Sequence, residues 1–310
     1  MIKKMTYSHI PEIQQIDKQC FKFDIPRRIE GIRGYINKCP NTAIVYELNN
    51  KIVGYNFMHI WGNFAWFGGF GVDPEYQGKG VGKELLSYTI KFLKEDMKLS
   101  NIGLYTMPES KYNVGLYMNM GFKPLKLSLG MVKEVNDFNT FFTSPEYEVT
   151  LVDISNELNY LNLRENIKIL SDQISRGLDL SSQLHLIKYE GFGTAFALKQ
   201  NGEFKGVVLC HTKHIREHST SCLEIRLICL SQDVDYKKAI DSILDKCNSY
   251  VKEINYSSIF IDCNTYNYDI CMHLLSTHGF KINKTQLTMI MDDEDYLNKY
   301  KGLVLCRWAG

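Results

Sequence analysis

The chain has 310 residues, about twice the usual length of a single domain, which favours two domains that each bury a core. Hydrophobic residues make up 45% of the chain and charged residues 23%, and this composition excludes disordered, collagen-like and coiled-coil proteins. The 36 basic and 35 acidic residues leave a net charge of +1, which excludes general nucleic-acid binding.

Targeting signals are absent from the sequence as it stands. The N-terminal segment lacks the apolar stretch of a signal peptide, and no later segment approaches 18 uninterrupted apolar residues. We therefore expect a cytoplasmic protein that contacts no membrane. The nine cysteines are odd in number and never stand in C-x-x-C spacing, which indicates reduced side chains that pack in the core.

The first half of the chain alternates strand and helix patterns. The predicted elements are, in chain order, a helix over 9–20, strands over 43–48, 51–59 and 64–72, a helix from Val81 to about Lys98, a strand over 102–106, a helix over 112–120 and a strand over 125–135. Asp73-Pro74 ends the third strand, since proline removes a ladder donor. This order predicts an α/β (α+β) fold built on a mixed sheet.

The pattern recurs in the second half. Leu85 and Ile243 are 158 residues apart, as are Gly121-Phe122 and Gly279-Phe280, while Gly54 and Gly206 are 152 apart, as are His59 and His211. The change of offset places about six extra residues in a hairpin over 211–222. The sequence therefore predicts two copies of one fold, over residues 1–145 and 146–310, divided at the polar stretch around Pro145.

A glycine-rich loop precedes the long helix. Its sequence runs Gln77-Gly78-Lys79-Gly80-Val81-Gly82-Lys83. Glycines let amide N–H groups converge at a helix N-terminus, which attracts phosphate, and the two lysines add positive charge. The Walker pattern fails because Glu84 stands where Ser or Thr is required, and G-x-G-x-G is not the dinucleotide fingerprint. A glycine turn without a ligand is the alternative.

This stretch resembles a known family. Residues 72–86, with Q-G-K-G-V-G at their centre, look like the acetyl-coenzyme A motif Q/R-x-x-G-x-G/A of the GNAT superfamily of N-acetyltransferases. Downstream, Gly115 to Phe122 resembles the second motif of that family, in which a helix carries Leu-Tyr shortly before Gly-Phe. The resemblance covers residues 1–135 well and 147–310 as a weaker copy. It implies two tandem GNAT-like acyltransferase folds.

The resemblance also implies a site. The pyrophosphate of acetyl-CoA would lie on the loop, and its pantetheine arm would pair with the strand before it, with a backbone N–H near Val72 holding the oxyanion. Tyr117 matches the tyrosine that protonates the departing thiolate. Ser110 stands where relatives have a coenzyme-contacting asparagine, with Asn113 nearby. The expected cofactor-binding residues are Phe70, Gly71, Val72, Gln77, Gly78, Lys79, Gly80, Val81, Gly82, Lys83, Ser110 and Asn113.

The general base stays open. Where some relatives place a glutamate, twelve residues before the tyrosine, this chain has Tyr105. Glu75, Glu109 and His59 are candidates, and a water relay is an equal alternative. Of the many aromatic residues on the predicted hairpin, Trp61 and Phe64 at its tip are the expected acceptor contacts.

The second copy lacks the loop. Its aligned positions carry Asp235, Tyr236, Lys238 and Ile240, and Leu275 replaces the tyrosine. This half lacks the glycines that would expose backbone amides, and a carboxylate stands at the start of its helix, so we expect it not to bind coenzyme A. It would instead support the fold, wall the acceptor cleft or make a dimer contact. No metal is expected, although the enlarged hairpin carries His211, His214, His218 and Cys222.

The predicted function is transfer of an acetyl group from acetyl-CoA directly to a primary amine of a small molecule or peptide in a ternary complex. Two alternatives remain: an acyl-CoA-binding sensor without efficient turnover, and transfer of a longer acyl group. The acceptor is not determined by these patterns, and a monomer or a homodimer is expected.

Overall fold

The computed structural model describes residues 1–310 except 23, 39–40, 136–143, 215–220, 292–294 and 309–310. The strands and helices of the first half are β1 (Ile2–Lys4), α1 (Ile10–Phe21), α2 (Ile29–Lys38), β2 (Ala43–Leu48), β3 (Lys51–Trp61), β4 (Phe64–Phe67), β5 (Gly71–Val72), α3 (Val81–Lys91), β6 (Asn101–Thr106), α4 (Lys111–Asn119) and β7 (Lys123–Glu134).

Two predicted elements differ from the structure. The strand predicted over 64–72 is divided into β4 and β5, because the backbone leaves the sheet at residues 68–70, where Gly69 has a φ of +73°. The predicted helix from Val81 to about Lys98 ends as an α-helix at Lys91 and continues as a π-helical turn, Phe92–Asp96.

The second half repeats this order. Its strands and helices are β8 (Glu148–Val152), α5 (Glu157–Ile174), α6 (Leu184–Glu190), β9 (Gly193–Gln200), β10 (Glu203–His211), β11 (Cys222–Leu230), α7 (Tyr236–Glu253), β12 (Ser258–Asn264), α8 (Tyr268–Met272), β13 (Lys281–Ile290) and β14 (Leu303–Cys306). From β9 to β13 each element follows its counterpart in the series β2 to β7. The predicted mixed-sheet class with two tandem copies is confirmed.

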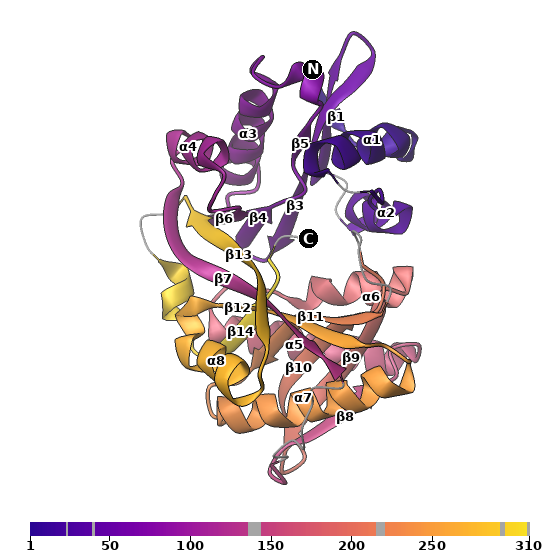
Figure 1. Cartoon of the computed structure of the whole chain (residues 1–310), viewed down its shortest axis with the longest axis vertical. Coiled ribbons are helices and arrows are strands. Elements are labelled where there is room, and N and C mark those ends of the chain that lie inside the picture. The colour runs from indigo at the N-terminus through magenta and orange to yellow at the C-terminus, as the bar shows by residue number, and fades with distance from the viewer. Residues whose placement is uncertain (23, 39–40, 136–143, 215–220, 292–294, 309–310) are drawn as a thin grey trace.

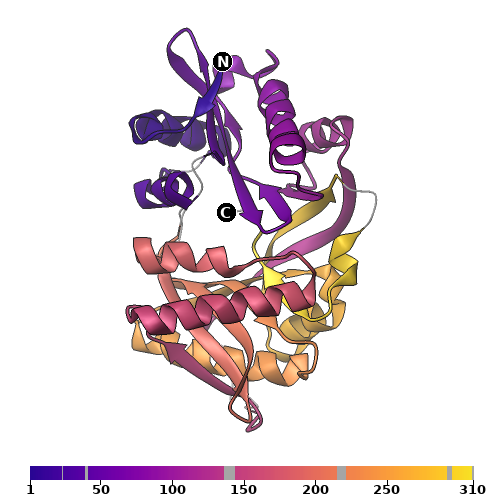
Figure 2. The same ribbon diagram turned by 180° about the vertical axis from the view of Figure 1, so that it is seen from behind.

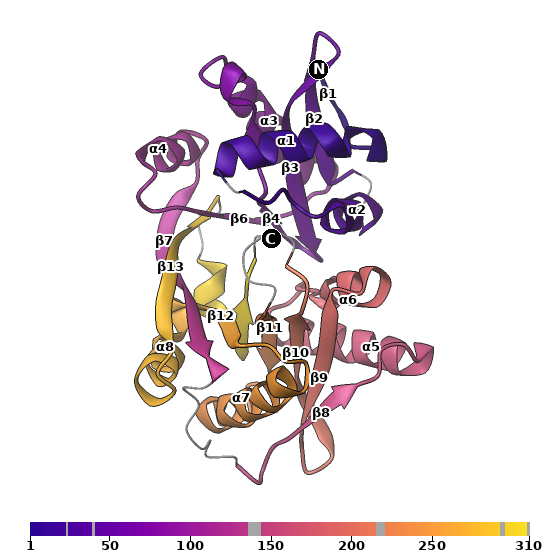
Figure 3. The ribbon, with the colours of Figure 1, turned by 45° about the vertical axis from the view of Figure 1, so that its right-hand side comes forward.

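All strands join one sheet (Figure 1). Its order is β1-β2-β3-β4-β6-β13-β7-β12-β11-β10-β9-β8, with β5 paired to β3 and β14 paired to β11. Helices cover both faces: α1 and α2 lie opposite α3 and α4 in the first half (Figure 3), and α5 and α6 lie opposite α7 in the second (Figure 2). Separate hydrophobic cores fill these layers.

The two halves exchange a strand. β13, from the end of the chain, lies between β6 and β7, and β7 lies between β13 and β12. Figure 1 shows the yellow β13 running beside the magenta β7 into the first half. Each half is therefore completed by a strand of the other, and a cut at residue 145 would leave both incomplete. The predicted boundary at 145 stays a prediction about sequence repetition.

Strand β3 is buried along almost its whole length and separates the two faces of the first half. Asn56 donates a hydrogen bond of 2.8 Å to Thr89 Oγ1 of α3, whereas the hydroxyl of Tyr55 bonds to Asp17 of α1. Because side chains alternate along a strand, Phe57, His59 and Trp61 follow Tyr55 onto the α1 and α2 face. This face continues into the contact with the second half.

None of the helices in the described part of the chain is both long enough and apolar enough to cross a membrane.

Candidate functional site

Two neighbouring strands of the first half, β4 and β6, separate at a defined point. β4 pairs in parallel with β6 from Phe64 with Asn101 to Phe67 with Leu104. Beyond Phe67 the backbone turns away, and β5 pairs with β3 but with no other described strand. The edge of β5 that faces away from β3 therefore offers backbone hydrogen-bonding groups without a strand to receive them.

The backbone of Val72 faces the gap that opens between β5 and β6 beyond Phe67. Asp73 N–H donates to Val53 O at 2.9 Å, and Val72 stands opposite Gly54. In an antiparallel ladder every second pair exchanges both bonds, so the N–H and C=O of Val72 turn away from β3. The carbonyl accepts hydrogen bonds of 3.0 Å from Gln77 Nε2 and from Cys20 Sγ.

The glycine loop leads from β5 into α3. Gly78 and Gly80 have φ angles of +73° and +90°, and no atom lies within 4 Å of a Cβ built on either. Glycine is therefore favoured at these positions by the backbone conformation and not by a lack of space. Gly80 is the N-cap of α3, and Gln77 to Gly80 are exposed. The loop therefore presents backbone amides at a helix N-terminus to solvent, beside the open edge of β5.

The loop lysines are available to an anion. Lys79 lies over the ring of Tyr76 at 5.2 Å, Lys83 is exposed on the first turn of α3, and neither forms an ion pair with a described residue. Glu84 accepts a hydrogen bond of 2.8 Å from the hydroxyl of Tyr46. Val81 is buried in the core under α3, and a Cβ built on Gly82 would lie at ordinary contact distance, 3.4 Å from Phe70 and 3.6 Å from Val72.

Tyr117 of α4 lies on the same face as α3. It is 7% exposed, its ring centroid lies 6.1 Å from that of Phe67, and burial raises the pKa of its hydroxyl. The phenol therefore remains a proton donor throughout the neutral range. Ser110 is the N-cap of α4, and its hydroxyl accepts from Asn113 N–H at 3.4 Å. Both residues mark the α4 N-terminus.

The second half parts its strands in the same way but fills the gap. β11 and β12 pair from Cys222 with Ser258 to Ile225 with Ile261, and then separate. Antiparallel strand β14 pairs with Leu227 to Leu230 of β11, the residues that match 69–72 of the first half. At the start of α7, Asp235 accepts from the amides of Lys237 and Lys238 at 3.1 and 3.2 Å. In the second half, β14 and the Asp235 carboxylate thus occupy the positions that match the open edge of β5 and the N-terminus of α3.

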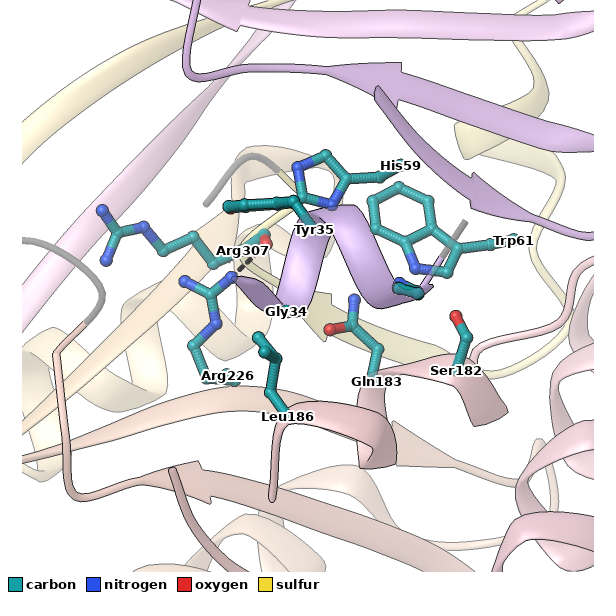
Figure 4. A pocket seen from close by; sticks show the side chains of 10 residues that line it. Gly34, Tyr35, His59, Trp61, Ser182, Gln183, Leu186, Arg226 and Arg307 are labelled. Carbon is teal, nitrogen blue, oxygen red and sulfur yellow. Dashed lines mark hydrogen bonds between the residues drawn. The ribbon is translucent and has the colours of Figure 1, made fainter. Parts of the chain in front are cut away.

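A pocket lies between the two halves (Figure 4). Tyr35, His59 and Trp61 face it from the first half, and Ser182, Gln183 and Arg226 face them from the second. Its remaining lining residues are Gly34, Lys38, Leu186 and Arg307. The predicted acceptor contact Trp61 lies here, whereas Phe64 is buried against Tyr296, with ring centroids 5.1 Å apart.

The pocket lies near the point where the backbone leaves β4. The Tyr35 ring stacks on Phe57 at 4.2 Å, and Phe57 O accepts from Gly68 N–H at 3.0 Å, where the backbone leaves β4. His59 lies two residues further along β3, about 7 Å away, and its ring is 5.2 Å from that of Tyr35. The pocket is therefore on the α1 and α2 face, close to the gap.

The three candidate bases have different surroundings. Glu75 is exposed and lies 3.6 Å from Lys51 Nζ, and Glu109 is exposed in the loop before α4. His59 is 8% exposed, and its Nε2 has no hydrogen-bond partner among the described residues. Burial, with added repulsion from Lys38 and Arg226, lowers its pKa well below the ordinary value. The imidazole is thus unprotonated at neutral pH.

Tyr105 cannot serve as the missing base. It is buried against Trp66, with ring centroids 4.6 Å apart, and burial raises the pKa of its hydroxyl. Phenol ionisation at neutral pH is therefore disfavoured.

The pocket lining is positively charged. The described lining residues include Lys38, Arg226 and Arg307 but no carboxylate. Behind them Glu224 accepts from Arg226 Nη1 at 2.9 Å and from Arg307 Nη1 at 2.6 Å, and Arg307 Nε lies 3.7 Å from Asp262 Oδ2, so two buried carboxylates pair with the two guanidinium groups. Sequence patterns missed all three cations, because they come from α2, β11 and the segment after β14.

The hairpin histidines do not form a common site among the described residues. His214 Nε2 lies 3.2 Å from Cys222 O, and its Nδ1 lies 3.4 Å from Glu224. Burial lowers the pKa of His211 to about 3 and raises that of the Cys222 thiol to about 11. His218 lies outside the described residues.

Comparisons with known proteins agree on one family. A model of the acetyltransferase (GNAT) family matches residues 10–122. An uncharacterized N-acetyltransferase of Methanocaldococcus jannaschii is 25% identical over 131 residues, which are 41% of this chain and 80% of that protein. The spermine/spermidine N(1)-acetyltransferase of Bacillus subtilis is 36% identical over 59 residues, 19% of this chain and 39% of that protein.

Solved structures extend the likeness to the whole chain. A candidate acetyltransferase from Pyrococcus horikoshii has a TM-score of 0.69 at 17% identity, covering 100% of this chain and 95% of its own. A tandem GNAT protein from the clavulanic acid biosynthesis pathway has a TM-score of 0.61 at 10% identity, covering 94% and 97%. At these identities the likeness shows the fold. Residues 10–122 match the GNAT acetyltransferase family, and the chain as a whole has the tandem GNAT fold.

Proposed function

We propose that the first half transfers an acetyl group from acetyl-CoA to a primary amine whose amino group reaches the pocket between the halves, a cavity of about 20 Å³ that holds one small group. The observation that carries the proposal is the open edge of β5 beside the glycine loop. A pantetheine arm offers alternating C=O and N–H groups, which suit an unpaired strand edge, and its pyrophosphate suits amides at a helix N-terminus. The second half supports the same assignment by contrast, since β14 and Asp235 fill the equivalent positions.

The thioester would react where β4 and β6 part. The Val72 N–H, which turns away from β3, would donate to the thioester carbonyl and stabilise the oxyanion formed on attack. The tetrahedral intermediate then expels the coenzyme A thiolate, and Tyr117 supplies the proton. Burial raises the pKa of its hydroxyl, which keeps the group protonated at neutral pH and also makes it a weaker acid than an exposed phenol.

His59 is the proposed general base. A lysine-like amine with a pKa of about 10.4 is almost wholly protonated at neutral pH and must lose a proton before it attacks. The His59 imidazole is unprotonated at neutral pH and its Nε2 has no hydrogen-bond partner among the described residues, although the burial and the cations that lower its pKa also make it a weaker base. His59 lies five residues along β3 from Gly54, the partner of Val72, which is about 16 Å, so the proton would reach it through intervening water. The exposed Glu75 and Glu109 lack such an enclosed position.

The charge of the pocket favours one class of amine. The lining carries three cations, Lys38, Arg226 and Arg307, of which the two arginines also pair with the buried Glu224 and Asp262, and these groups would donate hydrogen bonds to an acceptor that carries a carboxylate or phosphate beside its amine. They repel a polyamine, which is the substrate class named for the Bacillus subtilis relative. The acceptor proposed here is therefore an anionic amine.

A matched amine panel tests the reaction and the acceptor class together. Thiol release from acetyl-CoA is measured with tyrosine and tyramine, and with histidine and histamine, because each pair differs by one carboxylate. We expect kcat/KM to be at least about tenfold higher for the carboxylate-bearing member, and Lys38→Met to reduce this preference. Binding of acetyl-CoA with no turnover on any amine would favour the sensor alternative, and faster release with a longer acyl-CoA would favour longer-acyl transfer.

Gly80→Asp tests the phosphate loop. The new carboxylate would face the pyrophosphate, so we expect calorimetric affinity for acetyl-CoA to fall below detection. Gly80→Ala is the control, since it carries the same backbone strain at φ +90° without the charge. Lys238→Asp, at the matching position of the second half, is expected to leave affinity unchanged. Equal affinity for Gly80→Asp and Gly80→Ala would overturn the loop assignment.

Tyr117→Phe tests the general acid. Phenylalanine keeps the ring packing on Phe67 and Phe122, so the fold and the affinity for acetyl-CoA are expected to stay the same. Turnover is expected to fall by about 10²-fold or more, because the thiolate leaves without its proton donor. Steady-state kinetics and calorimetry on one preparation separate the two effects. Unchanged turnover removes Tyr117 from the mechanism.

His59→Gln tests the base through its pH profile. A base acts only when unprotonated, and the lowered pKa of His59 keeps it so until the pH falls well below about 6.5. We expect wild-type kcat/KM to fall only in that acidic range, and His59→Gln to lose about 10²-fold at pH 7. His211→Gln, at the matching position of β10, is the control. Wild-type activity in His59→Gln would instead support a water relay that does not end on His59.

A further inference from the structure

Three potential metal ligands converge in the second half, away from the site described above. Asp241 of α7 meets His273 and His278, which lie in the turn after α8. Asp241 Oδ1 is 2.6 Å from His273 Nε2 and 2.7 Å from His278 Nε2, and the two imidazole nitrogens are 3.3 Å apart. The three side chains are between 8% and 15% exposed.

A π-helical turn creates this convergence. In a regular α-helix, side chains five residues apart point about 140° away from each other around the axis. Residues His273–Thr277 instead form a π-helical turn, which His278 N–H closes by donating to His273 O at 3.2 Å. The turn brings the two imidazoles together, with ring planes 88° apart. Such single π turns are rare and occur frequently at functional sites.

The geometry is compatible with a cation as well as with hydrogen bonds. The two imidazole nitrogens subtend an angle of about 75° at the carboxylate oxygen, which is narrow for two donors to one oxygen. A cation at about 2.0–2.2 Å from each of the three atoms would fit about 1.2 Å above their plane. Ligand atoms at about 2.1 Å from a tetrahedral ion are about 3.4 Å apart, as the two imidazole nitrogens nearly are, so the Asp241 carboxylate would move outward by under about 1 Å on binding, and the fourth position would be left for water.

We propose that Asp241, His273 and His278 bind a divalent transition-metal cation such as Zn²⁺, which fastens α7 to the turn after α8. Two imidazole nitrogens and one carboxylate oxygen are a ligand set that zinc and its neighbours accept, whereas magnesium and calcium prefer oxygen ligands alone. Lys133 donates to the backbone carbonyl of His278.

The cluster belongs to the degenerate copy alone. Residues 158 positions earlier are Lys83, Gly115 and Met120, which bind no metal as a set. Lys83 lies on the first turn of α3, in the phosphate loop, whereas Gly115 lies in α4 and Met120 is the C-cap of that helix. The second half has no such loop, so a metal would join the helices that correspond to α3 and α4 in the copy that is not proposed to bind a coenzyme.

Zinc titration of the metal-stripped full-length protein tests the site. Calorimetry is expected to give one saturable zinc equivalent, with a rise in melting temperature that magnesium does not produce. His273→Gln is expected to weaken binding at least about 100-fold, while keeping an amide that can still donate to Asp241. His185→Gln, on α6, is the control for adventitious binding by histidine.

Two outcomes would overturn the assignment. Zinc binding in His273→Gln equal to that of the wild type would place the metal on other ligands, since this variant retains all nine cysteines. No saturable binding to the wild type would leave the cluster as hydrogen bonds only. Asp241→Asn gives a second check, because the amide keeps the side-chain shape but removes the charge that a cation needs, and it too should weaken binding.

Discussion

The structure depends on one requirement of the backbone: every buried N–H and C=O group needs a partner. β4 and β6 separate after Phe67 and Leu104, and so do β11 and β12 after Ile225 and Ile261. In the second half the chain supplies its own partner, strand β14. In the first half no described strand does so, and the same backbone geometry becomes a place for an extended ligand with amide groups. One fold thus gives a filled cleft and an open one.

The exchange of β7 and β13 makes the degenerate copy part of the first site. β13 pairs with β6, so the first half cannot complete its sheet without the end of the chain. The segment after β14 then brings Arg307 beside Arg226 at the pocket, and the Arg226 guanidinium donates to Arg307 O at 3.4 Å. A copy that has lost its own loop therefore still supplies charge to the pocket beside the other copy. This accounts for 310 residues serving one proposed active site.

Helix N-termini show the same division by electrostatics. α3 begins at Gly80 with exposed amides and two lysines, so its positive end is open to an anion. α7 begins at Asp235, whose carboxylate already accepts from two of its amides. The first four N–H groups of any helix lack partners within the helix. In α7 the Asp235 side chain supplies a partner, whereas in α3 the N–H groups stay open to a ligand.

The sequence by itself determined the mixed-sheet fold, the duplication, the glycine loop and the candidate Tyr117, because each depends on local periodicity, on backbone freedom or on a short motif. The sequence did not predict the features that depend on contacts between distant segments. Residues 64–72 have a continuous strand pattern, yet the strand breaks at 68–70. The exchange of β7 and β13, the cations around His59 and the meeting of Asp241 with His273 all join residues far apart in the chain. Pairing and burial between remote segments leave no periodic trace, so only the tertiary structure could decide them.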